Sequence, residues 1–195
     1  FADIKFGDTV VVMGIGPIGL MAIEGARHLG AARIAAVGTR PICVKLAREF
    51  GATDIISYKD GNVVEQVLAM TDGIGADSVI ICGGGDEVFS QAIDMVRYGI
   101  GTVSNVNYFG GTGNLPFPKF SGGRGMAGKT IDTELAKGGR VRIERMMQMV
   151  RCGRISPEKL VTHCFEGLDR IEDALYLMRD KPQDLVKVMV RIDWK

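Results

Sequence analysis

Apolar residues occur in short uninterrupted runs that are separated by glycine, proline and charged residues. Residues 9–13 are mostly β-branched and uncharged, which is typical of a strand buried on both faces of a parallel sheet. Pro17 suits the first turn of a following helix, good helix formers occupy residues 20–29, and Gly30 supplies a stop. The pattern therefore predicts one strand followed by one helix.

The same strand and helix pattern repeats through the first 134 residues. Strands separated by helical patterns of about 10 to 15 residues indicate right-handed crossovers and a parallel sheet. We therefore expect an α/β fold with a doubly wound parallel sheet, a Rossmann fold. Further strands are expected over residues 33–37, 54–58, 78–82, 102–106 and 129–133, and further helices over residues 41–50, 63–70 and 87–96.

The pattern changes beyond residue 135. Apolar side chains at helical spacing predict a helix over residues 143–150, Ser156 and Pro157 predict a helix start, and Asp169 with Glu172 resembles a capping box. The strict alternation of strand and helix does not continue. We expect strands over residues 161–165 and 185–192, and a domain boundary that divides residues 1–134 from residues 135–195.

Residues 109–128 form the longest interruption between two predicted strands. They contain nine glycines or prolines, which predicts a loop. Long loops inside compact domains are usually functional.

Composition excludes several classes of partner. A net charge of +1 without blocks of like charge gives no electrostatic footprint for nucleic acid or an anionic membrane. The longest run without a polar residue, Val10 to Ile23, is shorter than a membrane span and contains glycine and proline. Four cysteines without a CxxC pair favour free thiols in a reducing compartment, so we expect a cytoplasmic protein. The chain opens at Phe1 without a methionine, and we expect a fragment of a longer protein.

A glycine motif follows the first predicted strand and opens the first predicted helix. Its first glycine would permit a tight turn, its second would let the backbone approach a pyrophosphate, and its third would let the helix pack on the sheet. The alternative is a glycine-rich turn that binds nothing. The motif consists of Gly14, Ile15, Gly16, Pro17, Ile18 and Gly19.

The end of the second predicted strand bears on the choice of cofactor. An NAD site places a carboxylate about 20 residues beyond the glycines, where it accepts from the ribose hydroxyls. Here Gly38, Thr39 and Arg40 occupy that position, which removes repulsion of a 2′-phosphate and offers charge-assisted donors. These residues indicate NADP, and Tyr58 would flank the same phosphate. The alternatives are a turn glycine with a solvated charge, and a plain edge aromatic at Tyr58.

Other chemistry-bearing residues give weaker signals. His28 and His163 have no partner at metal-ligand spacing, and Cys82 ends an apolar strand, which is typical of a core residue. The sequence contains no nucleophile elbow and no paired carboxylates. We therefore expect a cofactor site without catalytic residues or metal ligands in this chain.

Six stretches of the sequence resemble the NADP-dependent zinc secondary-alcohol dehydrogenases, which are medium-chain dehydrogenases of anaerobic bacteria and protists. The resemblance covers nearly the whole chain. It implies a cofactor domain followed by a carboxy-terminal segment that belongs to the family's catalytic domain. The stretches are Asp8–Val10, Gly14–Met21, Ala36–Pro41, Gly51–Ile56, Asn105–Tyr108 and Leu160–His163.

The resemblance also implies roles for particular residues. Positions matching Ile15 to Ile18 contact the pyrophosphate in the family, and positions matching Gly38, Thr39, Arg40 and Tyr58 hold the 2′-phosphate. The cofactor site is completed by positions matching Val106, Asn107, Tyr108 and Lys181.

The implied activity is reversible hydride transfer between a secondary alcohol or ketone and NADP, with zinc polarising the substrate oxygen. The family's zinc ligands fall before residue 1, so this chain alone is expected to be inactive and zinc is expected only in the parent protein. Two alternatives are a non-catalytic nucleotide-binding module and a zinc-free quinone reductase of the same superfamily.

The resemblance further implies a homo-oligomer, a dimer or tetramer. We expect apolar contact surfaces at residues 102–106, at residues 143–150 and at the aromatic loop 109–120, with Phe109, Leu115, Phe117 and Phe120.

Overall fold

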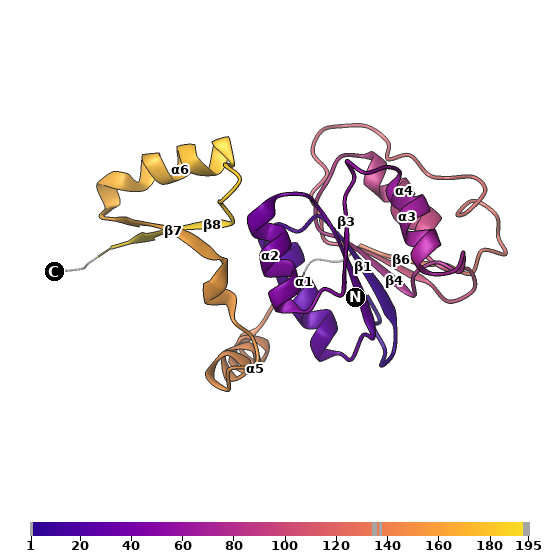
Figure 1. The fold of residues 1–195 in the computed structure, drawn as a ribbon, viewed down its shortest axis with the longest axis horizontal. Coiled ribbons are helices and arrows are strands. Elements are labelled where there is room, and N and C mark those ends of the chain that lie inside the picture. Colours follow the sequence, from indigo (N-terminus) through magenta and orange to yellow (C-terminus); the bar gives the residue numbers. More distant parts are fainter. Residues whose placement is uncertain (1, 134–135, 137, 193–195) are drawn as a thin grey trace.

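A computed structural model describes residues 2–133, 136 and 138–192, and its main feature is a six-stranded sheet (Figure 1). All neighbouring strands are parallel, in the order β3-β2-β1-β4-β5-β6. This order reverses between β1 and β4, as in the Rossmann fold. The strands are β1 (Thr9–Met13), β2 (Arg33–Val37), β3 (Asp54–Ile56), β4 (Ser78–Ile81), β5 (Thr102–Asn105) and β6 (Thr130–Asp132).

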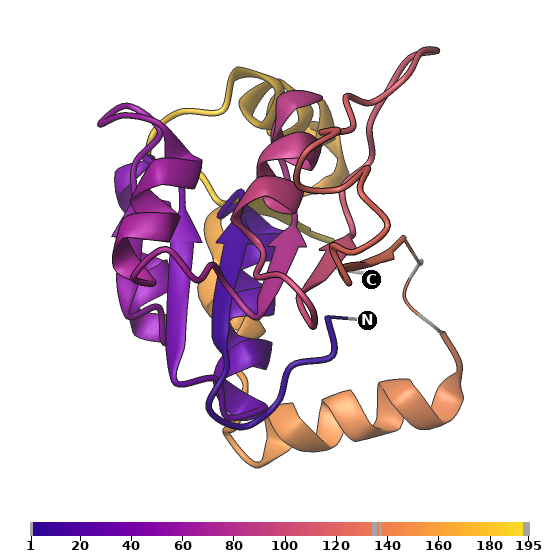
Figure 2. The same cartoon turned by 90° about the vertical axis from the view of Figure 1, so that its right-hand side faces the viewer.

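Helices cover both faces of this sheet (Figures 1 and 2), which confirms the doubly wound fold. Successive residues of a strand point to opposite faces. Accordingly Val10 and Val12 pack under one helix pair, while Val11 and Met13 pack under the other. The pairs are α1 (Pro17–His28) with α2 (Pro41–Phe50), and α3 (Val63–Met70) with α4 (Glu87–Met95).

The helix boundaries follow local chemistry. Pro17 and Pro41 begin α1 and α2, where a missing N–H costs nothing. Gly51 ends α2 with a φ of 114°, a left-handed conformation that favours glycine. The Oδ1 of Asn62 accepts from the backbone N–H of Val64 at 2.9 Å and caps α3.

The carboxy-terminal segment contains a second, two-stranded sheet. Strands β7 (Val161–Glu166) and β8 (Lys187–Arg191) are parallel and are joined through helix α6 (Ile171–Asp180). The strand and helix alternation therefore resumes here, and the expectation that it ends was wrong for these residues. Helix α5 (Arg140–Arg151) precedes this unit. The expected boundary at residues 134 and 135 lies outside the described residues, and the division into domains stays a prediction.

Of the two predicted helix starts in this segment, the one at Ser156 and Pro157 is confirmed as the start of a 3₁₀ helix, and the capping box at Asp169 was wrong. Helix α6 begins at Ile171, because residues Leu168–Arg170 form a 3₁₀ turn that displaces Asp169 from the capping position. Pro157 opens a second 3₁₀ turn (Pro157–Leu160), and the side chain of Ser156 makes no capping hydrogen bond.

The carboxy-terminal segment lies against α1 and α2 (Figure 1). The buried carboxylate of Glu24 accepts from the backbone N–H of Ser156 at 3.4 Å. The Nε2 of His28 lies 2.5 Å from the carbonyl oxygen of Arg154, and Val186 joins the hydrophobic core beneath α1 and α2. These contacts attach the segment to α1, which begins at the first glycine turn, and to the core that α1 shares with α2.

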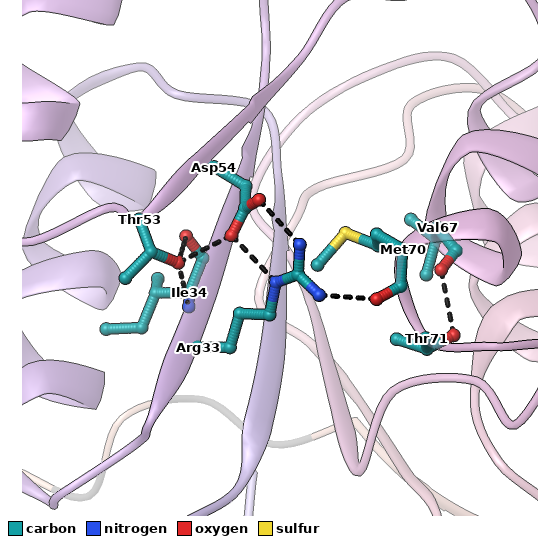
Figure 3. Close-up of polar contacts among 7 residues, drawn as sticks. All are labelled: Arg33, Ile34, Thr53, Asp54, Val67, Met70 and Thr71. Atoms are coloured by element: carbon teal, nitrogen blue, oxygen red, sulfur yellow. Dashed lines mark hydrogen bonds and ion pairs between the residues drawn. The ribbon is translucent and has the colours of Figure 1, made fainter.

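An ion pair ties the start of β2 to the start of β3 (Figure 3). The Nε and Nη2 of Arg33 donate to the two carboxylate oxygens of Asp54 at 2.9 and 2.8 Å, and Nη1 donates to the carbonyl of Met70. The hydrogen bond from Arg33 holds the pKa of the Asp54 carboxyl below its ordinary value. This network joins β2, β3 and the end of α3 at the amino-terminal edge of the sheet.

The loop after β5 is packed against α4. The ring of Phe109 meets Phe89 edge-on at 6.3 Å, and the Nζ of Lys129 donates to the carbonyl of Ile93 at 2.6 Å. Within the described ranges, no helix is both long and apolar enough to cross a bilayer.

Candidate functional site

A cavity of about 520 Å³ opens at the carboxyl ends of the central strands. It lies where β1 and β4 send their following chains to opposite faces of the sheet, the usual place for a ligand in an open α/β sheet. Its walls come from the turn after β1, the ends of β2 and β4, Tyr58 after β3, and the first turns of α3 and α4. They comprise Met13, Gly14, Ile15, Gly16, Val37, Gly38, Thr39, Arg40, Tyr58, Val63, Cys82, Gly83, Gly84, Glu87, Val88 and Gln91.

The three glycines of the first turn differ in what surrounds their Cβ positions. Gly14 has a φ of 86°, and a Cβ there would lie 2.8 Å from the backbone of Gly83. A Cβ on Gly19 would overlap the carbonyl oxygen of Gly14, so this glycine lets α1 pack against the turn. Gly16, in contrast, has no atom within 4 Å of its Cβ position. The open space at Gly16 lies at the amino terminus of α1, whose unpaired N–H groups and dipole favour an anion such as a pyrophosphate.

The three residues after β2 bring a positive charge to the cavity and include no carboxylate. Arg40 lines the cavity, and the hydroxyl of Thr39 donates to the Tyr58 hydroxyl at 2.7 Å. Gly38 leaves room for the side chain of Ile15, because a Cβ at Gly38 would lie 2.7 Å from the Ile15 Cδ1. A guanidinium and two hydroxyls beside an open glycine turn form a donor set that suits a ribose phosphate.

Seven of the fourteen residues that the sequence singled out line this cavity. The remaining seven do not: Pro17, Ile18 and Gly19 belong to the first turn of α1, Val106, Asn107 and Tyr108 follow β5, and Lys181 follows α6.

The residues after β5 approach the rim of the cavity. The Val106 N–H donates to the carbonyl of Ile81 at 3.0 Å, and the Asn107 amide lies 3.5 Å from the carbonyl of Gly84. The side chain of Tyr108 is 91% exposed. Lys181 is exposed and ends α6 with a φ of 45°.

Sequence reasoning missed the wall formed by β4 and α4. Cys82 packs against the core, as the sequence indicated, and it also lines the cavity, because it follows the carboxyl end of β4 beside the glycine turn. Burial raises the pKa of its thiol to about 12. Gly83 and Gly84 follow it, and Gly83 lies against Gly14 of the first glycine turn. A glycine run directly after an apolar strand was the signal that would have identified this wall.

The histidines and cysteines do not come together. In the part of the chain that the structure describes, no three His, Cys, Asp or Glu side chains are placed to hold a metal ion. His163 lies 3.0 Å from the Thr162 hydroxyl and 3.7 Å from the Asp184 carboxylate. These residues do not fit the zinc that the sequence resemblance implies for the longer protein.

Comparison with known proteins gives consistent results over nearly the whole chain. A family model described as "Zinc-binding dehydrogenase" matches residues 17–133. The chain is 51% identical to an NADP-dependent isopropanol dehydrogenase of Entamoeba histolytica over 99% of its length, and 52% identical to one of Thermoanaerobacter brockii over 97%. It spans about half of these relatives, 52% and 53% of their lengths.

A solved structure agrees with the sequence comparisons. The alcohol dehydrogenase TADH from Thermus sp. ATN1 superposes with a TM-score of 0.86 at 33% identity. The match covers 98% of this chain and 53% of that structure.

Proposed function

The chain belongs to the zinc-binding dehydrogenase family, and we propose that it is the NADP-binding part of an alcohol dehydrogenase. The longer protein would transfer hydride between a secondary alcohol or ketone and NADP(H). The observation that carries this proposal is the placement of Arg40 and the Thr39–Tyr58 hydroxyl pair beside the open glycine turn. Relatives named as NADP-dependent isopropanol dehydrogenases support the choice of cofactor and substrate class.

In this proposal the glycine turn binds the pyrophosphate. Residues Ile15, Gly16 and Ile18 supply backbone N–H groups at the start of α1, and Pro17, which has no N–H, contacts the pyrophosphate by close approach. Gly14 and Gly19 give the turn its shape, because a Cβ at either position would overlap neighbouring backbone, and Gly14 also lines the cavity.

The 2′-phosphate is proposed to lie between Arg40 and the Thr39–Tyr58 pair. Gly38 keeps a carboxylate out of this region, and the guanidinium supplies charge-assisted donors. Val106, Asn107, Tyr108 and Lys181 are proposed to complete the site, supported by the contact of Asn107 with the cavity residue Gly84.

The chain's own contribution to the reaction is binding and orientation. When bound, NADP supplies the nicotinamide ring that accepts or donates the hydride. The described residues offer no metal site, and the proposal places the family's zinc outside residues 1–195. The same reasoning places the substrate pocket largely outside this chain, so we propose that the chain alone does not turn over an alcohol.

We further propose that the protein is cytoplasmic and self-associates. The described side chains of α5 include exposed Val141, Ile143, Met146 and Met147, each at least 50% accessible. One expected contact surface was wrong, because β5 lies inside the sheet between β4 and β6, and within the expected loop surface Phe109 packs against Phe89. Phe117 and Phe120 remain exposed. Light scattering over a dilution series tests this proposal, and a monomer at every concentration would contradict it.

The cofactor proposal is tested by calorimetric titration of the 195-residue chain with NADP and with NAD. We expect tighter binding of NADP. Tighter binding of NAD, or no binding of either nucleotide, would overturn the proposed function.

A further inference from the structure

A backbone carbonyl from the far end of the chain holds the guanidinium of Arg40. The Nη1 of Arg40 donates to the carbonyl oxygen of Leu185 at 2.6 Å, although the two residues are 145 positions apart. Arg40 also lines the cavity. A guanidinium carries five N–H donors in a fixed plane, so a carbonyl that accepts one of them orients the plane and leaves the others for an anion.

The chain around Leu185 is itself fixed in place. Leu185 and Val186 are 3% and 7% exposed. The Leu185 N–H donates to the carbonyl of Pro182 at 3.1 Å, and the Val186 N–H donates to the Thr162 hydroxyl at 3.0 Å. The Leu185 carbonyl is therefore anchored by packing, by the turn that follows α6 and by strand β7.

A fixed hydrogen-bond acceptor reduces the side-chain entropy that Arg40 loses when it binds an anion. A free arginine loses side-chain entropy when it binds an anion, and this loss weakens binding. An arginine that is already oriented in the empty protein has less freedom to lose. The hydrogen bond to Leu185 therefore pre-organises the guanidinium before a ligand arrives.

We propose that Leu185 is a positioning residue that orients Arg40 toward the 2′-phosphate of the cofactor. This inference rests on the proposed function, in which Arg40 binds that phosphate. Leu185 acts through Arg40 and does not contact the nucleotide. The carboxy-terminal segment thereby takes part in the choice between NADP and NAD.

Two variants each remove one of the contacts that hold the Leu185 carbonyl in place. Leu185→Ala removes the buried side chain, and Thr162→Val removes the hydroxyl that accepts from Val186 while keeping a similar shape. Leu175→Ala, at a side chain that is 60% exposed on α6, is the matched control. The probes are 2′,5′-ADP and 5′-AMP, which differ only in the 2′-phosphate, and binding is measured by calorimetry.

We expect both variants to weaken 2′,5′-ADP binding about 3- to 10-fold, the range for one side chain that must be ordered on binding. Binding of 5′-AMP should stay unchanged in both variants, and the control variant should bind both nucleotides as the unmodified chain does. In an Arg40→Gln background, the same two substitutions should no longer affect 2′,5′-ADP, because their effect passes through Arg40.

The outcomes separate this inference from the proposed function. If the unmodified chain binds 2′,5′-ADP no better than 5′-AMP, the proposed NADP site is wrong and the inference with it. If the unmodified chain prefers 2′,5′-ADP, the inference alone is overturned by either of two results. The first is that both variants weaken the binding of the two nucleotides equally. The second is that the effect of the variants persists in the Arg40→Gln background.

Discussion

The side chain of Ile15 fills the space into which a side chain at Gly38 would project. A Cβ on Gly38 would overlap the Ile15 Cγ1 and lie 2.7 Å from its Cδ1. Ile15 is 5% exposed and belongs to the core under α1 and α2. The absence of a side chain at position 38 therefore has a packing reason as well as an electrostatic one.

Two substitutions at Gly38 separate these reasons. Gly38→Ala should weaken NADP and NAD binding to a similar extent, because any Cβ displaces Ile15. Gly38→Asp should weaken NADP about 10-fold more than Gly38→Ala does, by repulsion of the 2′-phosphate, and should regain NAD affinity through the ribose hydroxyls. Titration calorimetry with both nucleotides measures this. The electrostatic explanation fails if Gly38→Ala reproduces the whole effect of Gly38→Asp.

Two glycines of α1 should respond oppositely to alanine. Gly19→Ala should lower the free energy of unfolding by about 1–3 kcal/mol, because the new Cβ overlaps the Gly14 carbonyl oxygen. Gly25→Ala should raise it by about 0.5–1 kcal/mol, because its Cβ position has no atom within 4 Å and alanine favours the helix. Urea unfolding of both variants tests the comparison, and equal effects would contradict the packing of α1 against the turn.

The Arg33–Asp54 pair should give a defined pH dependence (Figure 3). Because the pKa of Asp54 is lowered in the folded chain, its contribution to stability is present above the ordinary aspartate pKa and is lost as the pH falls through the folded value. Asp54→Asn should cost about 1 kcal/mol at pH 7, since both side chains are partly solvated.

The control for this pair is Asp60→Asn, at an exposed turn residue. In urea unfolding, the difference between the unmodified chain and Asp54→Asn should shrink as the pH is lowered below 4. A difference that stays constant across the acid range would show that the Asp54 charge contributes nothing.

The strands and helices of the first 133 residues follow the sequence closely, because buried parallel strands and amphipathic helices each leave a clear hydrophobic period. Helix α2 begins and ends at the predicted residues, with Pro41 and the left-handed Gly51 at its ends. The carboxy-terminal pair β7 and β8 was predicted as strands but not as a parallel crossover unit. Its strands are short and half exposed, so their pattern does not reveal how they pair.

The candidate site was only partly predictable, because local motifs identify single turns and not the wall opposite. The glycine motif and the end of β2 led to six cavity residues, and Tyr58 after β3 is the seventh. Cys82 was missed because an apolar strand end has the same pattern whether it faces a core or a cavity. The contact between Arg40 and Leu185 joins residues 145 apart, and no local spacing encodes it.

The four cysteines should differ in reactivity. Cys152 and Cys164 are exposed, whereas burial raises the pKa of both Cys43 and Cys82, that of Cys82 to about 12. Only the thiolate attacks an alkylating reagent. With iodoacetamide at pH 7, mass spectrometry should therefore show Cys152 and Cys164 labelled well before Cys82.

The Cys82 rate should rise about 10-fold per pH unit between pH 7 and 9, because the thiolate fraction rises by that factor below the pKa. Bound NADP should slow the labelling of Cys82 and leave that of Cys152 unchanged. Rapid labelling of Cys82 at pH 7, or no protection by NADP, would place this thiol outside the cofactor cavity.

The central claim is that Arg40 lets this chain select NADP, and one calorimetric comparison tests it most directly. The unmodified chain, Arg40→Gln and the charge control Lys45→Gln, on the helix α2 that follows Arg40, are titrated with NADP and with NAD. We predict that the unmodified chain and Lys45→Gln prefer NADP, and that Arg40→Gln loses about 10- to 100-fold in NADP affinity with NAD binding unchanged. If Arg40→Gln retains the NADP preference, or weakens both nucleotides equally, the account of cofactor selection is contradicted.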